Sequence, residues 1–391
     1  MSLSPAVQSA AADSAADSAA VSEAALEEGA LVVAWSDGRR FSFHPLWLRE
    51  RAPDGQTLDG RNGQRTLEAA FLPLDLAVTG ARLAGDDRVE VTFSDGATAL
   101  FEGARLRRAL APRDQVDLLG DRELWDASLG GFPRYRLGDL KQGRPLLGLL
   151  DDLARLGCVL IEEVPPEKNG ILEFMGLIGN IKLTNWGGVE DVKVDADAFD
   201  LTLTNRGLEP HVDNPYRFST IGYVVLHCLE NSFEGGESTI VDGFAVAERL
   251  RREDPAAFEV LATTPVYFRY EDGTTVLDNL RSLIGVDAEG RVERVAWSNR
   301  TEFVDVRPVA ELTRYYAARR RFAELLYAEE MTVTFKLQPG QAFILDNYRV
   351  LHGRTPFELA GGGNRHMRQG YFDRDMVSSR QKVLRRDLDP D

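Results

Sequence analysis

The tripeptide His211-Val212-Asp213, completed by His352 far along the chain, constrains the possible folds of this sequence more than any other feature. In a β-strand, residues i and i+2 point to the same side, so His211 and Asp213 can face one metal ion. Two histidines and one carboxylate that leave the opposite face of the metal open are the usual ligands of non-haem Fe(II) oxygenases. The pattern therefore predicts a fold that brings two distant β-segments together around a metal.

The other histidines of the chain, which has five in all, are given no metal role. His227 lies in the apolar run 221–229, where a hydrogen-bonded core histidine is more common than a ligand. His44 precedes Pro45 and is expected to be structural, and His366 adjoins an arginine that is needed for another task. His211 and His352 are therefore the favoured pair.

Arg365 follows His352 after a glycine-rich segment, residues 361–363. If His352 ends one strand and Arg365 lies on the next, the guanidinium can face the same cavity as the metal. An arginine binds a carboxylate through two parallel hydrogen bonds and stays charged at working pH. A dicarboxylate such as 2-oxoglutarate could then chelate the metal at one end and pair with Arg365 at the other. The alternative is an ordinary surface arginine.

Several segments of the chain, taken together, carry a resemblance to a known family. Over residues 30 to 385 the sequence resembles the γ-butyrobetaine and trimethyllysine hydroxylase branch of the Fe(II)/2-oxoglutarate dioxygenases, within the taurine dioxygenase-like superfamily. The segments that carry the resemblance are 47–50, 211–215, 226–228, 235–244, 346–354, and Arg365-His366 with Tyr371.

This resemblance implies a metal centre and a co-substrate site. Fe(II) would be held by His211, Asp213 and His352, and 2-oxoglutarate would be anchored by Arg365 with help from the Ser238 hydroxyl. Arg354 is the substitute if Arg365 does not bind the co-substrate. Oxygen would take the remaining metal position, with succinate and CO₂ as co-products of the hydroxylation of an unactivated C–H bond.

The resemblance also implies a small cationic or zwitterionic substrate. Family members hold a trimethylammonium group in a box of aromatic rings, since ring faces attract quaternary ammonium. Tyr371 and Trp186 match two of the box positions, and Glu190 and Leu203 occupy two others. A carboxylate such as Glu190, or Asp200 in the same segment, can also attract a cation. Alternatively, the two aromatic residues are ordinary core side chains.

The changed box leaves more than one substrate open. A betaine-like compound is favoured, and 2-(trimethylamino)ethylphosphonate or another small zwitterion or amino acid is the alternative. Asn214 and Tyr216, which follow the ligand pair, together with Asn299-Arg300, could supply donors for an anionic tail.

Two further classes of function were weighed against an oxygenase. One is a jelly-roll that binds a ligand without catalysis, and the other is a zinc hydrolase that uses the same ligands. The complete triad together with Arg365 argues against the first. The lack of a candidate general base beside the triad argues against the second.

The amino-terminal domain of this family usually holds a structural zinc, and here the sequence departs from the family. The corresponding positions carry Ala52, Asp54, Thr57 and Ala97. A structural zinc site needs four nitrogen or sulfur ligands, so we expect no structural zinc. By resemblance, this domain is expected to serve packing or dimerisation, with a homodimer as the assembly.

With 391 residues the chain is long enough for two domains. The expected fold is a mixed, β-rich α+β protein, with a double-stranded β-helix (jelly-roll) catalytic domain flanked on one side by helices. We expect a disordered tail over residues 1–28, a small β-rich domain over 29–111, a linker over 112–132 and the dioxygenase domain over 133–391.

Composition excludes several partners. A net charge of −16, from 46 basic and 62 acidic residues, argues against nucleic acid and against an anionic membrane. No apolar run approaches the ~20 residues of a membrane span, and the first 28 residues lack the basic start and apolar core of a secretory signal. Cys158 and Cys228 lie in apolar runs, which indicates reduced core cysteines of a cytoplasmic protein.

Overall fold

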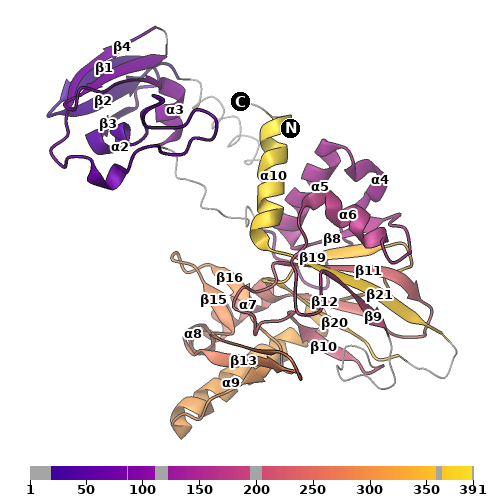
Figure 1. Ribbon diagram of the computed structural model, residues 1–391. Helices are drawn as coiled ribbons and strands as arrows, with labels where there is room; N and C mark the ends of the chain where they lie inside the picture. The colour runs from indigo at the N-terminus through magenta and orange to yellow at the C-terminus, as the bar shows by residue number, and fades with distance from the viewer. Residues whose placement is uncertain (1–18, 86, 111–121, 194–204, 358–362, 390–391) are drawn as a thin grey trace, which may run out of the picture. The chain divides into compact units, whose positions relative to one another are not determined.

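The computed structural model describes residues 19–85, 87–110, 122–193, 205–357 and 363–389. The chain forms two compact units, residues 1–117 and 118–391 (Figure 1). Within the described residues, no helix combines the length and the apolar character that a membrane span requires.

The amino-terminal unit consists of two three-stranded antiparallel sheets, ordered β1-β2-β3 and β4-β5-β6. Alternating apolar side chains of β2 and β5 are buried between them, among them Val33 and Val91. This is the β-rich domain that the sequence predicts. Its elements are β1 (Val21–Glu27), β2 (Ala30–Trp35), β3 (Arg40–Phe43), α2 (Pro45–Arg49), η1 (Ala69–Phe71), β4 (Val78–Leu83), β5 (Arg88–Phe93), β6 (Thr98–Glu102) and α3 (Gly103–Arg108).

The expected disordered tail over residues 1–28 is wrong for its last part, because residues 21–27 form β1. This strand pairs antiparallel with β2 after a tight turn at Glu28 and Gly29, which both have positive φ. β1 lies at a sheet edge, where backbone hydrogen bonds to one neighbour suffice and polar side chains can face solvent. Its composition therefore resembles that of a tail. Residues 1–18 lie outside the described part of the chain.

Arg49 forms a polar network in the region of Ala52 and Thr57, two of the positions that the resemblance associates with zinc. Its Nε donates to Asp95 Oδ2 at 2.7 Å, and its Nη1 donates to Thr57 Oγ1 at 2.5 Å. Burial by itself would raise the pKa of Asp95, but the Arg49 guanidinium lowers it below its usual value. Thr57 and Ala52 are fully buried. A polar network thus links the loop after α2 to the turn between β5 and β6.

The carboxy-terminal unit is built on two sheets that face each other. The larger has the order β7-β8-β19-β11-β21-β9, and the smaller has the order β10-β20-β12-β18. Strands of the larger sheet are β7 (Arg134–Arg136), β8 (Cys158–Glu162), β9 (Val189–Lys193), β11 (Tyr223–Asn231), β19 (Ala342–Asp346) and β21 (Arg365–Phe372). Those of the smaller are β10 (Leu208–His211), β12 (Ser238–Asp242), β18 (Thr332–Phe335) and β20 (Val350–Arg354).

Side-chain alternation along the strands separates the interior from the outer faces. On β11, Val224 and Cys228 pack toward the smaller sheet, in a cluster with Ile240 of β12. Val225 faces the opposite way, against helices. His227 shares that outward side and is fully buried, so it belongs to the packing layer and does not reach the metal ligands. The expected double-stranded β-helix is confirmed.

The expectation that helices flank the β-structure on one side is wrong, since they cover both outer faces (Figure 1). The outer face of the larger sheet packs on α4 (Leu137–Leu140), α5 (Gly143–Leu156), α6 (Gly170–Ile178) and α10 (Arg374–Leu388). Behind the smaller sheet lie α7 (Gly243–Glu253), α8 (Pro255–Thr263), β13 (Val266–Glu271), β14 (Val276–Arg281), β15 (Ile284–Val286), β16 (Val292–Val295), β17 (Glu302–Phe303), α9 (Val309–Leu326) and η3 (Glu329–Met331). Both sheets are therefore shielded from solvent on their outer sides.

The expected linker over residues 112–132 is also wrong for its later part. Within this segment, Trp125 is buried in the carboxy-terminal unit. The Trp125 indole donates to the Leu156 carbonyl at 2.7 Å, and its backbone N–H donates to Asp242 Oδ2 at 3.1 Å. One large apolar side chain thus anchors a segment whose acidic composition is typical of a linker.

A first prediction concerns Arg49. Replacing it with Met leaves Asp95 and Thr57 without their partner, which should cost about 1.5–3 kcal/mol of local stability. Hydrogen exchange of the β5 and β6 amides measures this. Arg82→Met, which removes an exposed ion pair with Glu90 on β5, is the matched control and should cost less than about 1 kcal/mol. Equal effects, or stoichiometric zinc that survives loss of the catalytic triad, would contradict this account of the unit.

Candidate active site

His211 and His352 come together because β10 and β20 pair antiparallel with these two residues opposite each other. Their ring centroids are 4.6 Å apart. Asp213 Oδ1 lies 3.4 Å from His211 Nε2 and 3.5 Å from His352 Nε2. In the described part of the chain, these three form the only group of His, Cys, Asp or Glu side chains whose ligand atoms lie close enough, within 4.8 Å, to share a metal ion.

Strand β10 ends at His211, so Asp213 lies just beyond the strand that the sequence predicts for it. Its backbone is held by the side chain of Asn347, which is 1% exposed. The Asp213 N–H donates to Asn347 Oδ1 at 2.7 Å, and Asn347 Nδ2 donates to the carbonyls of Asp213 and Ile221 at 2.9 and 3.1 Å. Asn347 was not identified as functional from the sequence, although it lies in the segment 346–354 that carries the resemblance.

Each of the two imidazoles has a feature that suits it to metal binding. Nδ1 of His211 lies 2.9 Å from the Glu209 carbonyl and donates to it, which leaves the Nε2 lone pair facing the site. Burial lowers the pKa of His352 to about 4, so its ring is neutral at physiological pH. Metal binding requires unprotonated imidazoles, and an outer hydrogen bond of this kind fixes ring orientation.

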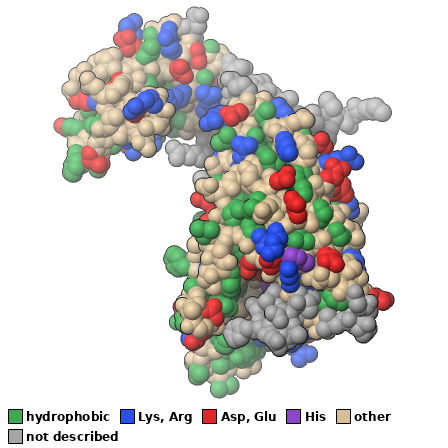
Figure 2. Space-filling model, turned by 45° about the vertical axis from the view of Figure 1, so that its right-hand side comes forward, with side chains coloured by type: hydrophobic (Ala, Val, Ile, Leu, Met, Phe, Trp, Pro, Cys, Tyr) green, Lys and Arg blue, Asp and Glu red, His purple; other side chains and the backbone are tan. Residues whose placement is uncertain are grey.

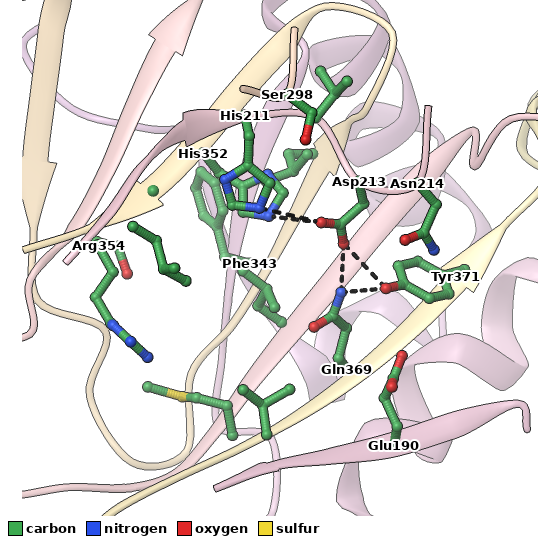
Figure 3. A pocket seen from close by; sticks show the side chains of 18 of the residues that line it. Glu190, His211, Asp213, Asn214, Ser298, Phe343, His352, Arg354, Gln369 and Tyr371 are labelled. Atoms are coloured by element: carbon green, nitrogen blue, oxygen red, sulfur yellow. Dashed lines mark hydrogen bonds and ion pairs between the residues drawn. The ribbon is translucent and has the colours of Figure 1, made fainter. Parts of the chain in front are cut away.

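Asp213 remains ionised although it is buried. Burial by itself would raise the pKa of this carboxyl, but the adjacent His352 and His211 rings and the hydrogen bonds to its oxygens hold the pKa well below its usual value. Gln369 Nε2 donates to Oδ2 at 2.5 Å, and the Tyr371 hydroxyl donates to the same oxygen at 3.1 Å. Figure 3 shows these bonds beside the triad. This donor set fits a divalent metal such as Fe(II).

A cavity of about 570 Å³ opens over the triad between the two sheets (Figure 3). Most of the residues that the sequence singles out line it: the triad, Trp186, Glu190, Asn214, Tyr216, Ser238, Arg354, Arg365 and Tyr371. Asn299 does not line it. Its side chain is exposed and accepts a hydrogen bond from Arg319 at 2.9 Å, so the prediction for Asn299 is wrong, while its neighbour Arg300 lines the cavity. Asp200 and Leu203 lie outside the described residues.

Three arginines line this cavity in an otherwise acidic protein: Arg300, Arg354 and Arg365. Arg365 is 9% exposed and has no hydrogen-bond or ion-pair partner among the described residues. Burial lowers its pKa to about 10, and burial together with Arg365 lowers the pKa of Arg354 to about 9. Both guanidiniums are still charged at neutral pH, so this side of the cavity favours anionic groups.

An aromatic wall lies elsewhere in the cavity. Tyr216 stacks on Tyr270 at 5.2 Å, and Trp186 meets Tyr270 edge-on at 5.3 Å. Tyr270 was missed in the sequence because it lies on β13, outside the segments of resemblance. The Asn214 backbone has a φ of 52°, a left-handed conformation that asparagine tolerates. Asn214 Nδ2 is buried and has no partner in the described part of the structure, so it is available to a bound molecule.

His366, which was given no metal role, lies on the other side of β21. Its Nε2 is 2.6 Å from Asp191 Oδ1, and Arg368 pairs with the same carboxylate at 3.1 Å. Figure 2 shows that acidic and basic side chains are also interspersed over the face of the molecule that it draws.

Fold and site together define a non-haem Fe(II)/2-oxoglutarate dioxygenase. The chain belongs to the taurine catabolism dioxygenase TauD, TfdA family, whose profile matches residues 127–371. Residues 23–107 match the γ-butyrobetaine hydroxylase-like amino-terminal domain.

Curated relatives cover nearly the whole chain. A γ-butyrobetaine dioxygenase of Pseudomonas sp. (strain AK-1) is 34% identical over 90% of this chain and 93% of that protein. The γ-butyrobetaine dioxygenase of Homo sapiens is 28% identical, over 91% and 94% of the two chains. A mitochondrial trimethyllysine dioxygenase of Gallus gallus is 27% identical, over 88% and 83%. The resemblance stated from the sequence is confirmed.

A second prediction tests the metal centre. His211→Ala, Asp213→Ala and His352→Ala should each abolish Fe(II)-dependent turnover, because two remaining ligands bind a metal weakly. The melting temperature should change little, since the β-sheet core packs without the metal. Succinate formed from 2-oxoglutarate is the measurement. Near-normal turnover by any of the three variants would exclude that residue as a ligand.

Proposed function

We propose that this dioxygenase hydroxylates an unactivated C–H bond of a small zwitterion that carries a quaternary or protonated ammonium group. The observation that supports this most is the polarity of the cavity. Figure 3 shows Arg354 on one side of the triad, and Tyr371 and Glu190 on the other. A cavity with a cationic side and an aromatic, acidic side suits a co-substrate dianion and a substrate with a positive head.

We propose Arg365 as the anchor of the distal carboxylate of 2-oxoglutarate, with Ser238 as a second donor. Both line the cavity, and Arg365 carries a charge that no described residue neutralises. A bidentate pair with a carboxylate would satisfy it. When bound, the iron and 2-oxoglutarate supply the oxidising power, with succinate and CO₂ as co-products. The protein orients both substrates and keeps water from the reacting carbon.

For the positive head, we propose the part of the cavity around Glu190, Trp186 and Tyr371. The faces of aromatic rings and a carboxylate both attract a quaternary ammonium. Glu190 lies on the neighbouring strand β9, opposite Gln369. Burial raises the pKa of Tyr371, and the nearby charge of Glu190 raises it further. The names of the relatives, γ-butyrobetaine and trimethyllysine dioxygenases, agree with a trimethylammonium substrate.

A second candidate substrate is 2-(trimethylamino)ethylphosphonate. The specific observation in its favour is Arg300, which lines the cavity and adds a further positive charge near Arg354. A phosphonate carries more negative charge than a carboxylate and uses such a cluster better. Arg300 and the free Nδ2 of Asn214 would then bind the anionic tail.

Succinate release in the presence of candidate substrates tests the proposal. The panel contains γ-butyrobetaine, trimethyllysine, 2-(trimethylamino)ethylphosphonate and the tert-butyl isostere of each, in which a carbon replaces the quaternary nitrogen. We expect coupled turnover with at least one trimethylammonium compound and much less with its isostere. If the best substrate found carries no cationic nitrogen, the proposed head group is wrong, while the dioxygenase chemistry stands.

A third prediction concerns the co-substrate. Arg365→Ala should raise the apparent KM for 2-oxoglutarate at least tenfold, since losing one partner of a buried charge pair costs on the order of 2–5 kcal/mol. Arg368→Ala is the matched control, because Arg368 lies on the same strand, faces the other way and pairs with Asp191. An unchanged KM in Arg365→Ala would transfer the role to Arg354, which would be replaced next.

A fourth prediction concerns the substrate head. Trp186→Ala and Tyr371→Ala should reduce coupled turnover far more than they reduce the melting temperature, because a desolvated cation–aromatic contact is worth about 2 kcal/mol. Glu190→Gln should raise KM for the cationic substrate and leave KM for 2-oxoglutarate unchanged. Full activity in all three variants would show that these side chains do not contact the substrate.

A further inference from the structure

The two oxygens of Asp213 have different surroundings. Oδ1 faces the Nε2 atoms of His211 and His352, at 3.4 and 3.5 Å. Oδ2 points away and accepts two hydrogen bonds, from Gln369 Nε2 at 2.5 Å and from the Tyr371 hydroxyl at 3.1 Å. Figure 3 shows the carboxylate held between these two sets of groups. Only one of its oxygens is therefore directed at the place where a metal would lie.

The amide of Gln369 has one orientation that satisfies its neighbours. Nε2 carries two hydrogens, and it lies 2.5 Å from Asp213 Oδ2 and 2.5 Å from the Tyr371 hydroxyl oxygen. The flipped amide would bring its oxygen against an ionised carboxylate, which is repulsive. The Tyr371 hydroxyl, which accepts from Gln369, donates its own hydrogen to Asp213. The three side chains thus form a closed set of hydrogen bonds with 7% exposure at Gln369 and 4% at Tyr371.

Side-chain alternation along β21 produces this arrangement. Arg365, Met367, Gln369 and Tyr371 all line the cavity, as residues two apart on a strand do. The neighbouring strand β9 fixes the register, with Gln369 opposite Glu190. The strand that presents the charge for the co-substrate therefore also presents the donors that hold the metal-binding carboxylate.

A carboxylate can bind a metal through one oxygen or through both. If Asp213 turned to offer Oδ2 as well, it would occupy a position that an oxygenase of this type keeps open for co-substrate and oxygen. The hydrogen bonds to Oδ2 oppose such a turn, since it would leave buried donors of Gln369 and Tyr371 unpaired. Hydrogen bonds to a metal ligand from residues that do not themselves bind the metal commonly fix its orientation and raise metal affinity.

We propose that Gln369, supported by the Tyr371 hydroxyl, is a positioning residue that holds Asp213 in a one-oxygen orientation and so keeps a metal position open for 2-oxoglutarate. The proposal rests on the triad and the cavity and does not depend on the identity of the substrate.

A fifth prediction follows. Gln369→Met keeps the length of the side chain and removes both donors. Titration of the metal-free protein with Mn(II), followed calorimetrically without substrate, should show affinity lower by about 10- to 100-fold. Binding of 2-oxoglutarate to the Mn(II)-loaded variant should also weaken, and the KM for 2-oxoglutarate should rise, because the released carboxylate competes for its position.

Gln381→Met is the matched control. Gln381 Nε2 also donates to an aspartate, Asp151 Oδ1 at 2.6 Å, but it does so on α10, away from the cavity. This variant should bind Mn(II) with wild-type affinity. The proposal is overturned if Gln369→Met binds Mn(II) and 2-oxoglutarate with wild-type affinity and only its melting temperature is lower. Gln369 would then have a structural role alone.

Tyr371→Phe keeps the ring and removes one hydrogen bond to Asp213, so it provides a second variant if Gln369→Met does not fold. We expect a loss of Mn(II) affinity intermediate between the wild type and Gln369→Met, because one of the two hydrogen bonds to Asp213 Oδ2 remains. Unaltered Mn(II) affinity in this variant would also count against the proposal. Because these titrations contain no substrate, a wrong substrate assignment would leave their outcome unaffected.

Discussion

A buried ion pair between Arg349 and Asp242 holds the catalytic unit in the form that the active site needs. Arg349 is 1% exposed and Asp242 is fully buried. Nε and Nη2 of the arginine donate to the two carboxylate oxygens at 3.0 and 2.7 Å. Burial by itself would lower the pKa of Arg349, but Asp242 raises it. Charges this deep are tolerated only when paired and fully hydrogen-bonded, so removing either partner would be severely destabilising.

This pair ties the end of β12 to the turn between β19 and β20, and that turn supplies the active site. Asn347 in the turn holds the backbone of Asp213, and β20 then delivers His352 opposite His211. The same ion pair therefore stabilises both the fold and the metal site. The net charge of the chain does not predict the local charge of this site. The chain has a net charge of −16, yet buried arginines make one side of the cavity positive.

Much of the architecture follows from local patterns. Residues 143–156 form α5, for example, because their apolar residues recur at helical spacing on one face. Where the prediction was wrong, the stabilising contact came from a distant segment. Residues 21–27 form a strand because they pair with the edge of β2. The acidic segment around Trp125 packs because Asp242 and Leu156 accept hydrogen bonds from the backbone N–H and the indole N–H of Trp125.

The sequence by itself determined the class of chemistry, because the types of His211, Asp213, His352 and Arg365 and their strand-like settings restrict what they can bind. Tertiary structure alone decided which side chains support them. Nothing in the sequence marks Asn347 and Gln369 as functional, and only the pairing of the β-strands places them against Asp213. In the same way, only the structure shows that Arg300 lines the cavity and Asn299 does not. Local periodicity specifies which face a residue takes, but partners across the chain depend on the register of strands that are distant in sequence.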